Sequence, residues 1–426
     1  MHRAIEQYRE FLMTGFVKSV QPVVIQKALG AVVTDVYGRE YIDCFAGISV
    51  VNAGHNNPAV MAAAREQIDN LIHCCSYLYY SQPTGALAEK MAQITPGRLK
   101  KSFFANSGAE AVEGAMKLAK LYTGKHEMIA LQCGFHGRTW GALSVTGNAR
   151  RKRGAGPSAS GVAFAPAPDI YRAPRHPEDW ARSFENIVRF STSGDVAAFI
   201  AEPVLGEGGI IVPPAQYFIE IKKVLDRYGI LFIADEVQTG FGRTGKMFAV
   251  EHYGVEPDIL VTGKGIAGGF PLAAFTARDE IAAAFRPGDH LSTFGGNPVS
   301  CAAALASIGA IEQKNLCAKS WQDGEYITGK LRGLQKQFPL IGDVRGLGLM
   351  IGLELADGED QQPAAAQAEL IRESCRRKGV LIGVGGVDGN VVRIQPPLVI
   401  SRRQIDAVVE ALTESFAELS CARAAD

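Results

Sequence analysis

Apolar and polar positions follow two different patterns along the chain. In its middle, short continuous apolar runs alternate with stretches of helical periodicity. The strand-like runs are EMIALQC, AAFIAEPV, GILFIADE and PDILVTGK, and helices are expected over 110–122 and 215–228. This alternation predicts an α/β domain with a mainly parallel sheet. Because the apolar runs are continuous, the strands are expected to be buried on both faces.

Both chain ends are patterned differently. Residues 31–45 predict a short antiparallel meander that turns at Tyr37-Gly38, and 342–355 and 380–400 are rich in strand-like segments. An amphipathic helix is expected over 402–418. These patterns predict a smaller α+β domain built from both ends of the chain.

The length of 426 residues exceeds what one compact core usually holds. We therefore predict a large domain over 61–318. The smaller domain would combine an N-terminal segment, 1–60, with a C-terminal part, 319–426.

The composition narrows the classes of function. Lys plus Arg and Asp plus Glu each number 44, and this balance argues against binding to nucleic acid or to an anionic membrane. The eight cysteines contain no C-x-x-C pair, which indicates reduced thiols. The first 16 residues mix charged with apolar positions, unlike a signal peptide, and no apolar run approaches the ~20 residues of a membrane span. We expect a soluble, cytoplasmic protein without a metal site.

The first candidate motif, NSGAEA, follows the apolar run SFFA. Ser107 and Glu110 have the spacing of a capping box, so a helix should begin here. A helix N-terminus attracts phosphate, and Gly108 would let the backbone approach it closely. Taken alone, the same residues also describe an ordinary capped helix.

The second motif, GFHGRTW, places an aromatic ring, an imidazole and a guanidinium between glycines. Phe135 and His136 suit a planar ligand, and Arg138 suits a carboxylate. An ordinary loop with a surface arginine fits equally.

Two carboxylates follow buried strands. Glu202 ends AAFIAE and Asp235 ends GILFIAD, at the sheet edge where open α/β sheets bind ligands. A buried carboxylate needs a partner, and Asp235 could hold a protonated heterocyclic nitrogen. A salt bridge to a nearby helix is the alternative for either residue.

The run GFGRTG at 240–245 matches G-x-G-x-x-G, the signature of a dinucleotide loop. It does not directly follow its strand, and no clear ribose-binding acid follows it. A nicotinamide- or flavin-dependent oxidoreductase is therefore only the alternative from another class of enzyme.

Lys264 ends an apolar strand within VTGKGIAGGFP. Desolvation there would lower the pKa of its amine and make it a nucleophile. A single lysine is more often a solvated surface residue. Together, however, the phosphate seat, the aromatic ring, the carboxylate and the lysine are what a pyridoxal phosphate site requires.

The motifs NSGAEA, GFHGRT, EPVLGEGG, DEVQTGFGRTG, TGKGIAGGFP and STFGGNP, in this order, resemble the class III (ω-) aminotransferases. The likeness runs from about Gly38 to the end of the chain. It implies fold type I of the pyridoxal 5′-phosphate enzymes, in which a large domain and a smaller α+β domain build each subunit. It also implies a homodimer that shares its active sites, with a tetramer as the further option.

The resemblance assigns roles around the cofactor. Lys264 matches the Schiff-base lysine that also carries the proton, Asp235 the partner of the ring nitrogen, and Glu202 a residue near the ring or its lysine. The remaining cofactor residues implied are Ser107, Gly108 and Ala109 for the phosphate, Phe135 and Val237 on the two ring faces, His136, Gln238 at the ring hydroxyl, and Thr293 donated by the neighbouring subunit.

Substrate residues are implied in the same way. Arg138 matches the arginine that 4-aminobutyrate aminotransferases use for the distal carboxylate, and Arg393 resembles the α-carboxylate arginine. Glu207 resembles the glutamate that neutralises Arg393 while an ω-amine donor is bound. Ile48 stands where those enzymes have an apolar side chain.

Related enzymes share much of this pattern. The 2,2-dialkylglycine decarboxylases resemble the chain in scaffold, but they have glutamine at position 48 and no arginine at 138, which disfavours decarboxylation here. Leu205 replaces a glutamine common in the family. Alanine–glyoxylate, β-alanine and ornithine aminotransferases and amino-acid racemases are also similar.

These motifs predict a ping-pong aminotransferase that moves the amino group of an ω-amino acid, best 4-aminobutyrate, to 2-oxoglutarate. Pyruvate and glyoxylate are alternative acceptors. A non-catalytic protein that binds pyridoxal phosphate is a further alternative.

Overall fold

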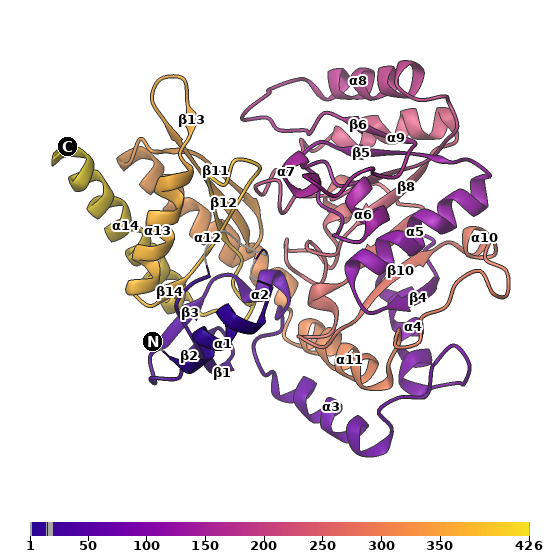
Figure 1. Ribbon diagram of the computed structural model, residues 1–426, viewed down its shortest axis with the longest axis horizontal. Coiled ribbons are helices and arrows are strands. Elements are labelled where there is room, and N and C mark those ends of the chain that lie inside the picture. Colours follow the sequence, from indigo (N-terminus) through magenta and orange to yellow (C-terminus); the bar gives the residue numbers. More distant parts are fainter. Residues whose placement is uncertain (1, 14, 16–19, 426) are drawn as a thin grey trace.

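The computed structural model describes residues 2–13, 15 and 20–425; residues 1, 14, 16–19 and 426 lie outside the described part, and the N-terminal ones belong to the predicted segment 1–60. The larger part of the molecule is built on a seven-stranded sheet (Figure 1). Its strands, in spatial order, are β4 (Lys101–Ala105), β10 (Ala273–Ala277), β9 (Ile259–Thr262), β8 (Leu231–Asp235), β7 (Val196–Ala201), β5 (Glu127–Leu131) and β6 (Val162–Ala165).

Only β10 runs against its neighbours: it pairs antiparallel with β4 and β9, whereas the other neighbouring pairs are parallel. The mainly parallel sheet predicted from the apolar runs is confirmed, and those four runs form β5, β7, β8 and β9.

Side chains on both faces of this sheet are buried, as continuous apolar strands require. In β5, Met128 and Ala130 pack into the cluster beneath α5, whereas Ile129 and Leu131 pack into the cluster on the opposite face. That second cluster includes side chains of α8 and α9. The helices concerned are α5 (Gly108–Thr123), α8 (Pro177–Phe190) and α9 (Tyr217–Tyr228).

The start of α5 follows the predicted capping pattern with one difference. Ser107 Oγ accepts from the backbone N–H of Glu110 at 3.3 Å, as expected of an N-cap. The carboxylate of Glu110, however, accepts from the backbone N–H of Asn106 at 3.1 Å and not from that of Ser107. The helix therefore begins where predicted, and the Glu110 carboxylate also holds Asn106, the residue before the N-cap.

The smaller part combines both chain ends, and Figure 1 shows both termini there. A four-stranded sheet joins β1 (Ile25–Leu29), β2 (Val32–Asp35) and β3 (Glu40–Asp43) to β14 (Val380–Leu381). A second sheet is formed by β11 (Ile341–Leu347), β12 (Met350–Asp357), β16 (Val391–Ile394), β15 (Gly383–Gly385) and the short β13 (Gln362–Pro363). The helices packed here are α12 (Leu316–Gln337), α13 (Ala365–Arg377) and α14 (Arg402–Ala425).

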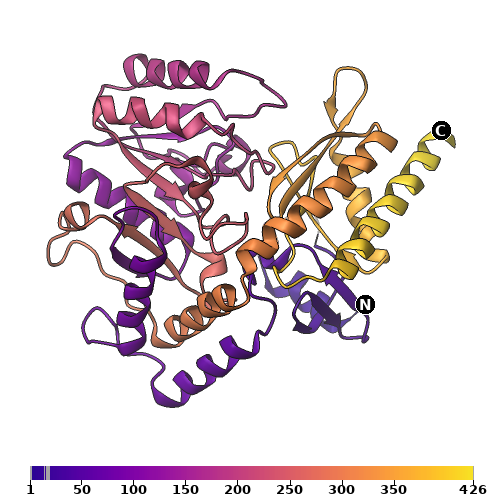
Figure 2. The same ribbon diagram turned by 180° about the vertical axis from the view of Figure 1, so that it is seen from behind.

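Figure 2 shows α12 running from the larger part into the smaller one. The predicted boundary at residue 318 falls in its first turn, and the division at 60 and 318 stays a prediction. The smaller α+β part built from both ends is confirmed.

The remaining helices connect these layers or lie at the surface. They are α1 (Arg3–Phe11), α2 (Ala46–Ser49), α3 (Pro58–Asn70), α4 (Gln82–Ile94), α6 (Trp140–Ser144), α7 (Ala149–Lys152), α10 (Asp279–Ala282), α11 (Pro298–Gln313) and the short 3₁₀ turns η1 (Ala249–Tyr253) and η2 (Lys264–Ile266). Within residues 2–13, 15 and 20–425, no helix is both long and apolar enough to cross a membrane.

Candidate functional site

A pocket opens where β8 and β9 end. The empty space in it, which includes open solvent at its mouth, is about 540 Å³. All residues predicted to hold a cofactor line it except Ser107 and Thr293. The lining consists of Gly108, Ala109, Phe135, His136, Gly137, Glu202, Asp235, Val237, Gln238 and Lys264.

Lys264 follows β9 and reaches into this pocket. Its φ is +41°, an uncommon conformation for a lysine that stores backbone strain. Burial lowers the pKa of its amine, while the negative charges of Glu207 and Glu202 oppose the change. A lysine with a depressed pKa has a larger fraction of neutral, nucleophilic amine.

Asp235 and His136 form a buried pair, with 2.7 Å between Oδ2 and Nδ1. The other carboxylate oxygen, Oδ1, accepts from the backbone N–H of Val237 at 3.0 Å. His136 Nε2 is buried and has no hydrogen-bond partner among the described residues. The pair therefore fixes Asp235 at the pocket wall, where its charge can stabilise a positive charge on a bound ligand.

Glu202 joins two loops through its carboxylate. Its Oε1 accepts from the backbone N–H of Phe135 and its Oε2 from that of Gly206, each at 2.9 Å. Burial, reinforced by the charge of Asp235, raises the pKa of Glu202 to about 7. These bonds hold the aromatic ring of Phe135 in place at the pocket.

Two glycines of the pocket lining let neighbouring side chains approach the backbone closely. A Cβ on Gly108 would lie 2.8 Å from Val237 Cγ1, and a Cβ on Gly137 would lie 2.7 Å from that of Ala109. These contacts bring the N-terminus of α5, with its free N–H groups, up to the pocket. Gly137 was missed by sequence reasoning, although its place in the GFHGRT motif could have drawn attention to it.

Residues from distant parts of the chain hydrogen-bond to Gln238 and to the residues that follow it. Gln238 Oε1 accepts from Gln395 Nε2 at 3.0 Å. Asn52 Nδ2 donates to the backbone carbonyls of Gly240 and Phe241 at 3.2 and 2.9 Å. Neither Gln395 nor Asn52 was predicted, because no local pattern marks a partner this far away in sequence.

Arg393 and Glu207 form an ion pair of 2.7 Å between Nη1 and Oε1. The guanidinium lies over the ring of Phe45, 5.0 Å from its centre. A Cβ on Gly385 would lie 2.7 Å from Arg393 Nε, so this glycine leaves room for the arginine. Burial acts to raise the pKa of Glu207, but the charge and hydrogen bond of Arg393, together with the charges of Lys264 and Arg151, outweigh burial and hold that pKa at about 2.

The four predicted substrate residues, Arg138, Ile48, Glu207 and Arg393, all lie outside the lining of this pocket. Arg138 is exposed, with its guanidinium 5.7 Å from the centre of the Phe135 ring. Ile48 belongs to α2, which is a left-handed turn: φ is +51° at Ala46, +63° at Gly47, +68° at Ile48 and +60° at Ser49. Asp43 Oδ1 stabilises the entry to this turn by accepting from the N–H groups of Phe45 and Ala46.

Thr293 is exposed and lies on a loop that contacts another part of the chain. The carbonyl of Gly296 accepts from Ser76 Oγ at 2.8 Å, and Asn106 Nδ2 donates to Ser292 Oγ at 3.3 Å. The loop therefore lies next to Asn106, which follows β4, while Thr293 is exposed.

The GFGRTG run has an interior role. Arg243 is fully buried and donates to the carbonyls of Leu349 and Pro396 at 2.9 and 2.6 Å and to Asn52 Oδ1 at 2.6 Å. Burial lowers its pKa to about 9. Among the described residues, none of 240–245 lines the pocket, so this run joins parts of the fold.

Comparison with known proteins gives a consistent result. The family described as Aminotransferase class-III matches residues 16–416. The acetylornithine aminotransferase of Methanosarcina mazei is 45% identical over 93% of this chain and 92% of that protein. The leucine/methionine racemase of Thermococcus litoralis is 38% identical (99% and 97% covered), and the 5-aminovalerate aminotransferase DavT of Pseudomonas putida is 40% identical (98% and 99%). An amine transaminase from an uncultivated Pseudomonas species, solved in a PLP-bound form, has a TM-score of 0.90 at 34% identity, covering 96% and 98%.

Proposed function

The chain belongs to the class III aminotransferase family, and on that basis we propose that it moves the amino group of an ω-amino acid to 2-oxoglutarate in a ping-pong reaction. Aminotransferases of this class depend on pyridoxal 5′-phosphate. This cofactor supplies the carbonyl carbon that exchanges for the amino group and a ring that withdraws electrons.

The residues around the pocket fit this cofactor. The amine of Lys264 has a lowered pKa, and the Asp235 carboxylate is fixed at the wall by His136. The free N–H groups at the start of α5 suit the phosphate, and Phe135 and Val237 stand in the same lining as apolar surfaces for the ring. Ser107, the N-cap of α5, directly precedes Gly108 of this lining and would offer its hydroxyl to the phosphate.

Within this proposal the side chains have different tasks. Lys264 Nζ would hold the cofactor and would also move the proton on the substrate carbon, and Asp235 would keep a proton on the ring nitrogen. Gln238 would bind the ring hydroxyl. Glu202, whose oxygens both accept from backbone N–H groups, is better supported as a positioning residue for Phe135 than as a catalytic group.

The observation that carries the substrate class is the ion pair between Arg393 and Glu207. While Glu207 neutralises Arg393, an ω-amine carbon that bears no carboxylate can approach Lys264. When Arg393 is free, it can bind the α-carboxylate of 2-oxoglutarate bidentately. Arg138 at the mouth would bind the distal carboxylate, and Ile48 would offer an apolar contact.

4-Aminobutyrate is the first candidate donor. Relatives named as acetylornithine and 5-aminovalerate aminotransferases support a second candidate, a longer ω-amine of the ornithine type. Both candidate donors have a primary amine remote from a carboxylate. Such an amine end needs no cation beside it, so Arg393 can stay paired with Glu207 while the donor is bound.

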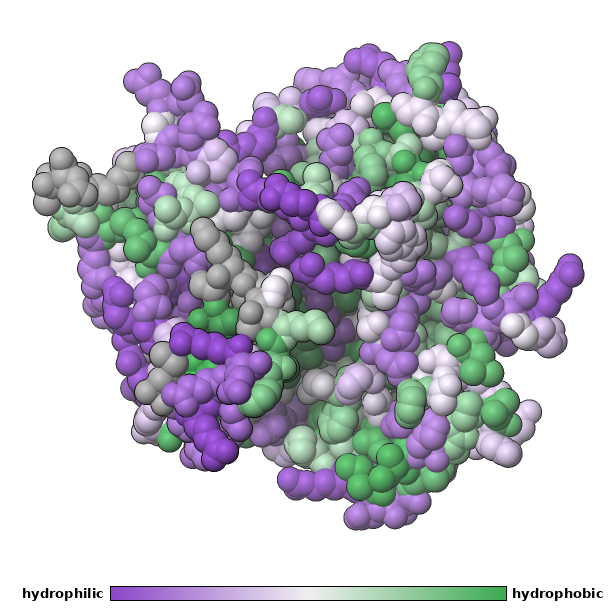
Figure 3. Space-filling model, viewed as in Figure 1, coloured by the Kyte–Doolittle hydropathy of each residue, from purple (hydrophilic) through white to green (hydrophobic). Residues whose placement is uncertain are grey.

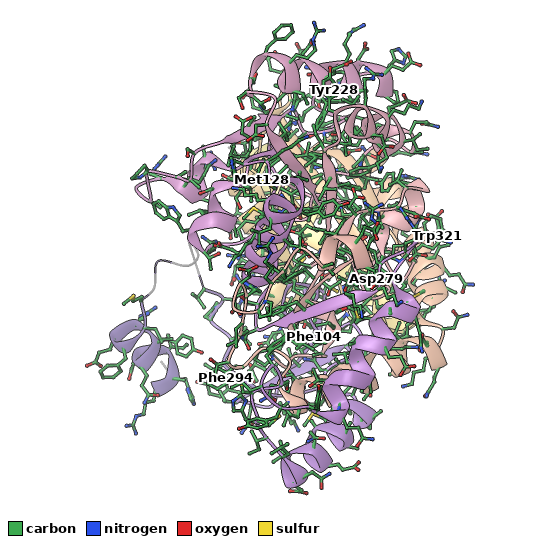
Figure 4. The ribbon with its side chains drawn as sticks, turned by 90° about the vertical axis from the view of Figure 1, so that its right-hand side faces the viewer. Phe104, Met128, Tyr228, Asp279, Phe294 and Trp321 are labelled. Carbon is green, nitrogen blue, oxygen red and sulfur yellow. The ribbon has the colours of Figure 1, made fainter. Side chains whose placement is uncertain are left out.

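We also propose a homodimer with shared active sites. Exposed apolar side chains cluster on two segments that hydrogen-bond to each other through Ser76 and Gly296; they are Leu71, Ile72, Leu78, Tyr79, Tyr80, Leu291 and Phe294. Apolar surface gathers over α3 and the segment after it in Figure 3, and Figure 4 shows Phe294 on the side from which α1 projects. Thr293 lies within this surface, where it could reach the phosphate of a second copy.

The test uses purified enzyme loaded with pyridoxal 5′-phosphate. Each of 4-aminobutyrate, 5-aminovalerate, ornithine and N-acetylornithine is supplied with 2-oxoglutarate, and glutamate and the cofactor's visible absorbance are followed. At least one donor should give stoichiometric glutamate, with pyruvate and glyoxylate as poorer acceptors. If none changes the absorbance, the proposed substrate class is wrong. Formation of a D-amino acid without any acceptor would instead indicate a racemase.

A further inference from the structure

Glu207 lies between two guanidinium groups. Its Oε1 is 2.7 Å from Arg393 Nη1, and its Oε2 is 3.5 Å from Arg151 Nη2. Arg151 belongs to α7, which none of the motifs above includes. One carboxylate therefore has a close, buried partner and a longer contact with a more exposed arginine.

The two arginines differ in their access to solvent. The side chain of Arg393 is 4% exposed and that of Arg151 is 36% exposed, while that of Glu207 is 16% exposed. Neither arginine is part of the pocket lining, so they differ by exposure alone. Arg151 can follow the carboxylate of Glu207 outward without leaving water, whereas Arg393 is buried and lies over the ring of Phe45.

Release of Arg393 creates a physical problem. If Arg393 binds the α-carboxylate of a substrate, Glu207 must leave it, and a mostly buried carboxylate without a partner is costly. The contact with Arg151 is already formed, so a small rotation of the Glu207 side chain can shorten it.

We propose that Arg151 is a positioning residue that receives Glu207 when Arg393 binds the α-carboxylate of glutamate or 2-oxoglutarate. This inference rests on the proposed function. It makes Arg151 selective for one half of the reaction: with an ω-amine donor Glu207 keeps Arg393, and Arg151 contributes little. Because the pair is partly exposed, removing Arg151 should weaken the binding of α-carboxylate substrates by up to about fivefold.

The experiment measures binding without turnover. 2-Oxoglutarate is titrated calorimetrically into enzyme loaded with pyridoxal 5′-phosphate, a form that lacks the amino group to be transferred. Arg151→Met should raise the dissociation constant by about three- to fivefold, and Arg151→Lys should restore most of the affinity. Arg150→Met is the matched control, because the guanidinium of Arg150 pairs with the exposed Asp388, at 3.5 Å, and not with Glu207. This variant should bind 2-oxoglutarate as the wild type does.

A double-mutant cycle tests whether Arg151 acts through Glu207. In Glu207→Gln no carboxylate needs a partner, so adding Arg151→Met should change the dissociation constant less than twofold. An equal loss in both backgrounds would mean that Arg151 binds the substrate directly, and the proposal would be overturned. The KM for the ω-amino donor should also be nearly the same in Arg151→Met and wild type; an increase as large as that for 2-oxoglutarate would overturn it too.

The same measurements separate this inference from the proposed function. If the wild type accepts no ω-amino donor but the calorimetric cycle shows coupling, the substrate class is wrong and the role of Arg151 stands. If ω-amino donors react and the coupling is absent, only the role of Arg151 fails.

Discussion

Replacement of Gly108 by alanine should weaken the binding of pyridoxal phosphate without unfolding the protein. The added Cβ would lie 2.8 and 3.0 Å from the two methyl carbons of Val237, where ordinary contacts are 3.4–4 Å. The φ of Gly108 is outside the left-handed region, so an alanine meets a contact problem and no backbone strain. Valine is stiff about χ1 and cannot simply rotate away.

The size of the effect follows from where Val237 must go. Overpacking of this kind costs about 1–3 kcal/mol. Val237 lines the pocket and is proposed to pack against the ring, so the displaced methyl groups meet the bound cofactor. If most of this free-energy cost arises in the cofactor-bound enzyme and little in the cofactor-free enzyme, the dissociation constant of the cofactor rises by about 5- to 150-fold.

The assay titrates pyridoxal 5′-phosphate into cofactor-free enzyme and follows the visible absorbance. The control is Gly309→Ala in α11, where an added Cβ meets nothing within 4 Å; alanine also favours the helix there. Unchanged cofactor affinity in Gly108→Ala would refute the idea that Gly108 and Val237 together shape the ring's seat. Equal losses of affinity in both variants would refute it as well.

Three further substitutions probe stability. Glu236 is fully buried, and burial raises its pKa from 4.5 to about 7. The folded wild type therefore loses stability as the pH rises from 4.5 through 7. Chemical denaturation should show Glu236→Gln to be more stable than the wild type by up to about 3 kcal/mol at pH 8, but not at pH 4.5. In Arg345→Met, buried Glu354, which lies 2.7 Å from the Arg345 guanidinium in the wild type, keeps Arg172 as its one cation among the described residues, so urea unfolding should show a loss of about 3 kcal/mol. Ser107→Ala removes the N-cap of α5 and should cost about 1 kcal/mol in thermal unfolding, with a weaker affinity for inorganic phosphate in the cofactor-free enzyme. A Ser107→Thr control keeps the capping hydroxyl and should recover both properties.

Much of the fold could be predicted because its signals are local. Continuous apolar runs indicated strands buried on both faces, and Ser107 with Glu110 marked the start of α5. The antiparallel position of β10 between β4 and β9 was not predicted, since strand order depends on contacts between distant segments. The left-handed turn at Ile48 could not be foreseen either, because a β-branched residue normally avoids positive φ.

The residues of the candidate site also fall into two groups: those that local sequence marks and those that only the fold brings into contact. Loops that directly follow strands brought Phe135, Asp235 and Lys264 together, as parallel strands must. Arg151 was missed because it stands in the run ARRKRG, which is typical of a solvated surface. Only the fold shows which cation of that run contacts Glu207.

The turn between Glu202 and Glu207 connects the pocket lining to the proposed substrate-binding pair of Glu207 and Arg393, and its packing limits how Glu207 can move. A Cβ on Gly206 would lie 2.3 Å from Gln238 Oε1, and one on Gly208 would lie 2.8 Å from the carbonyl oxygen of Cys133. The backbone N–H of Gly206 also donates to Glu202. Because the backbone is wedged on both sides, Glu207 has to leave Arg393 by rotation of its own side chain. That motion leaves Glu202 and the loop of Phe135 undisturbed, so the substrate side can change its charge pairing while the cofactor side stays fixed.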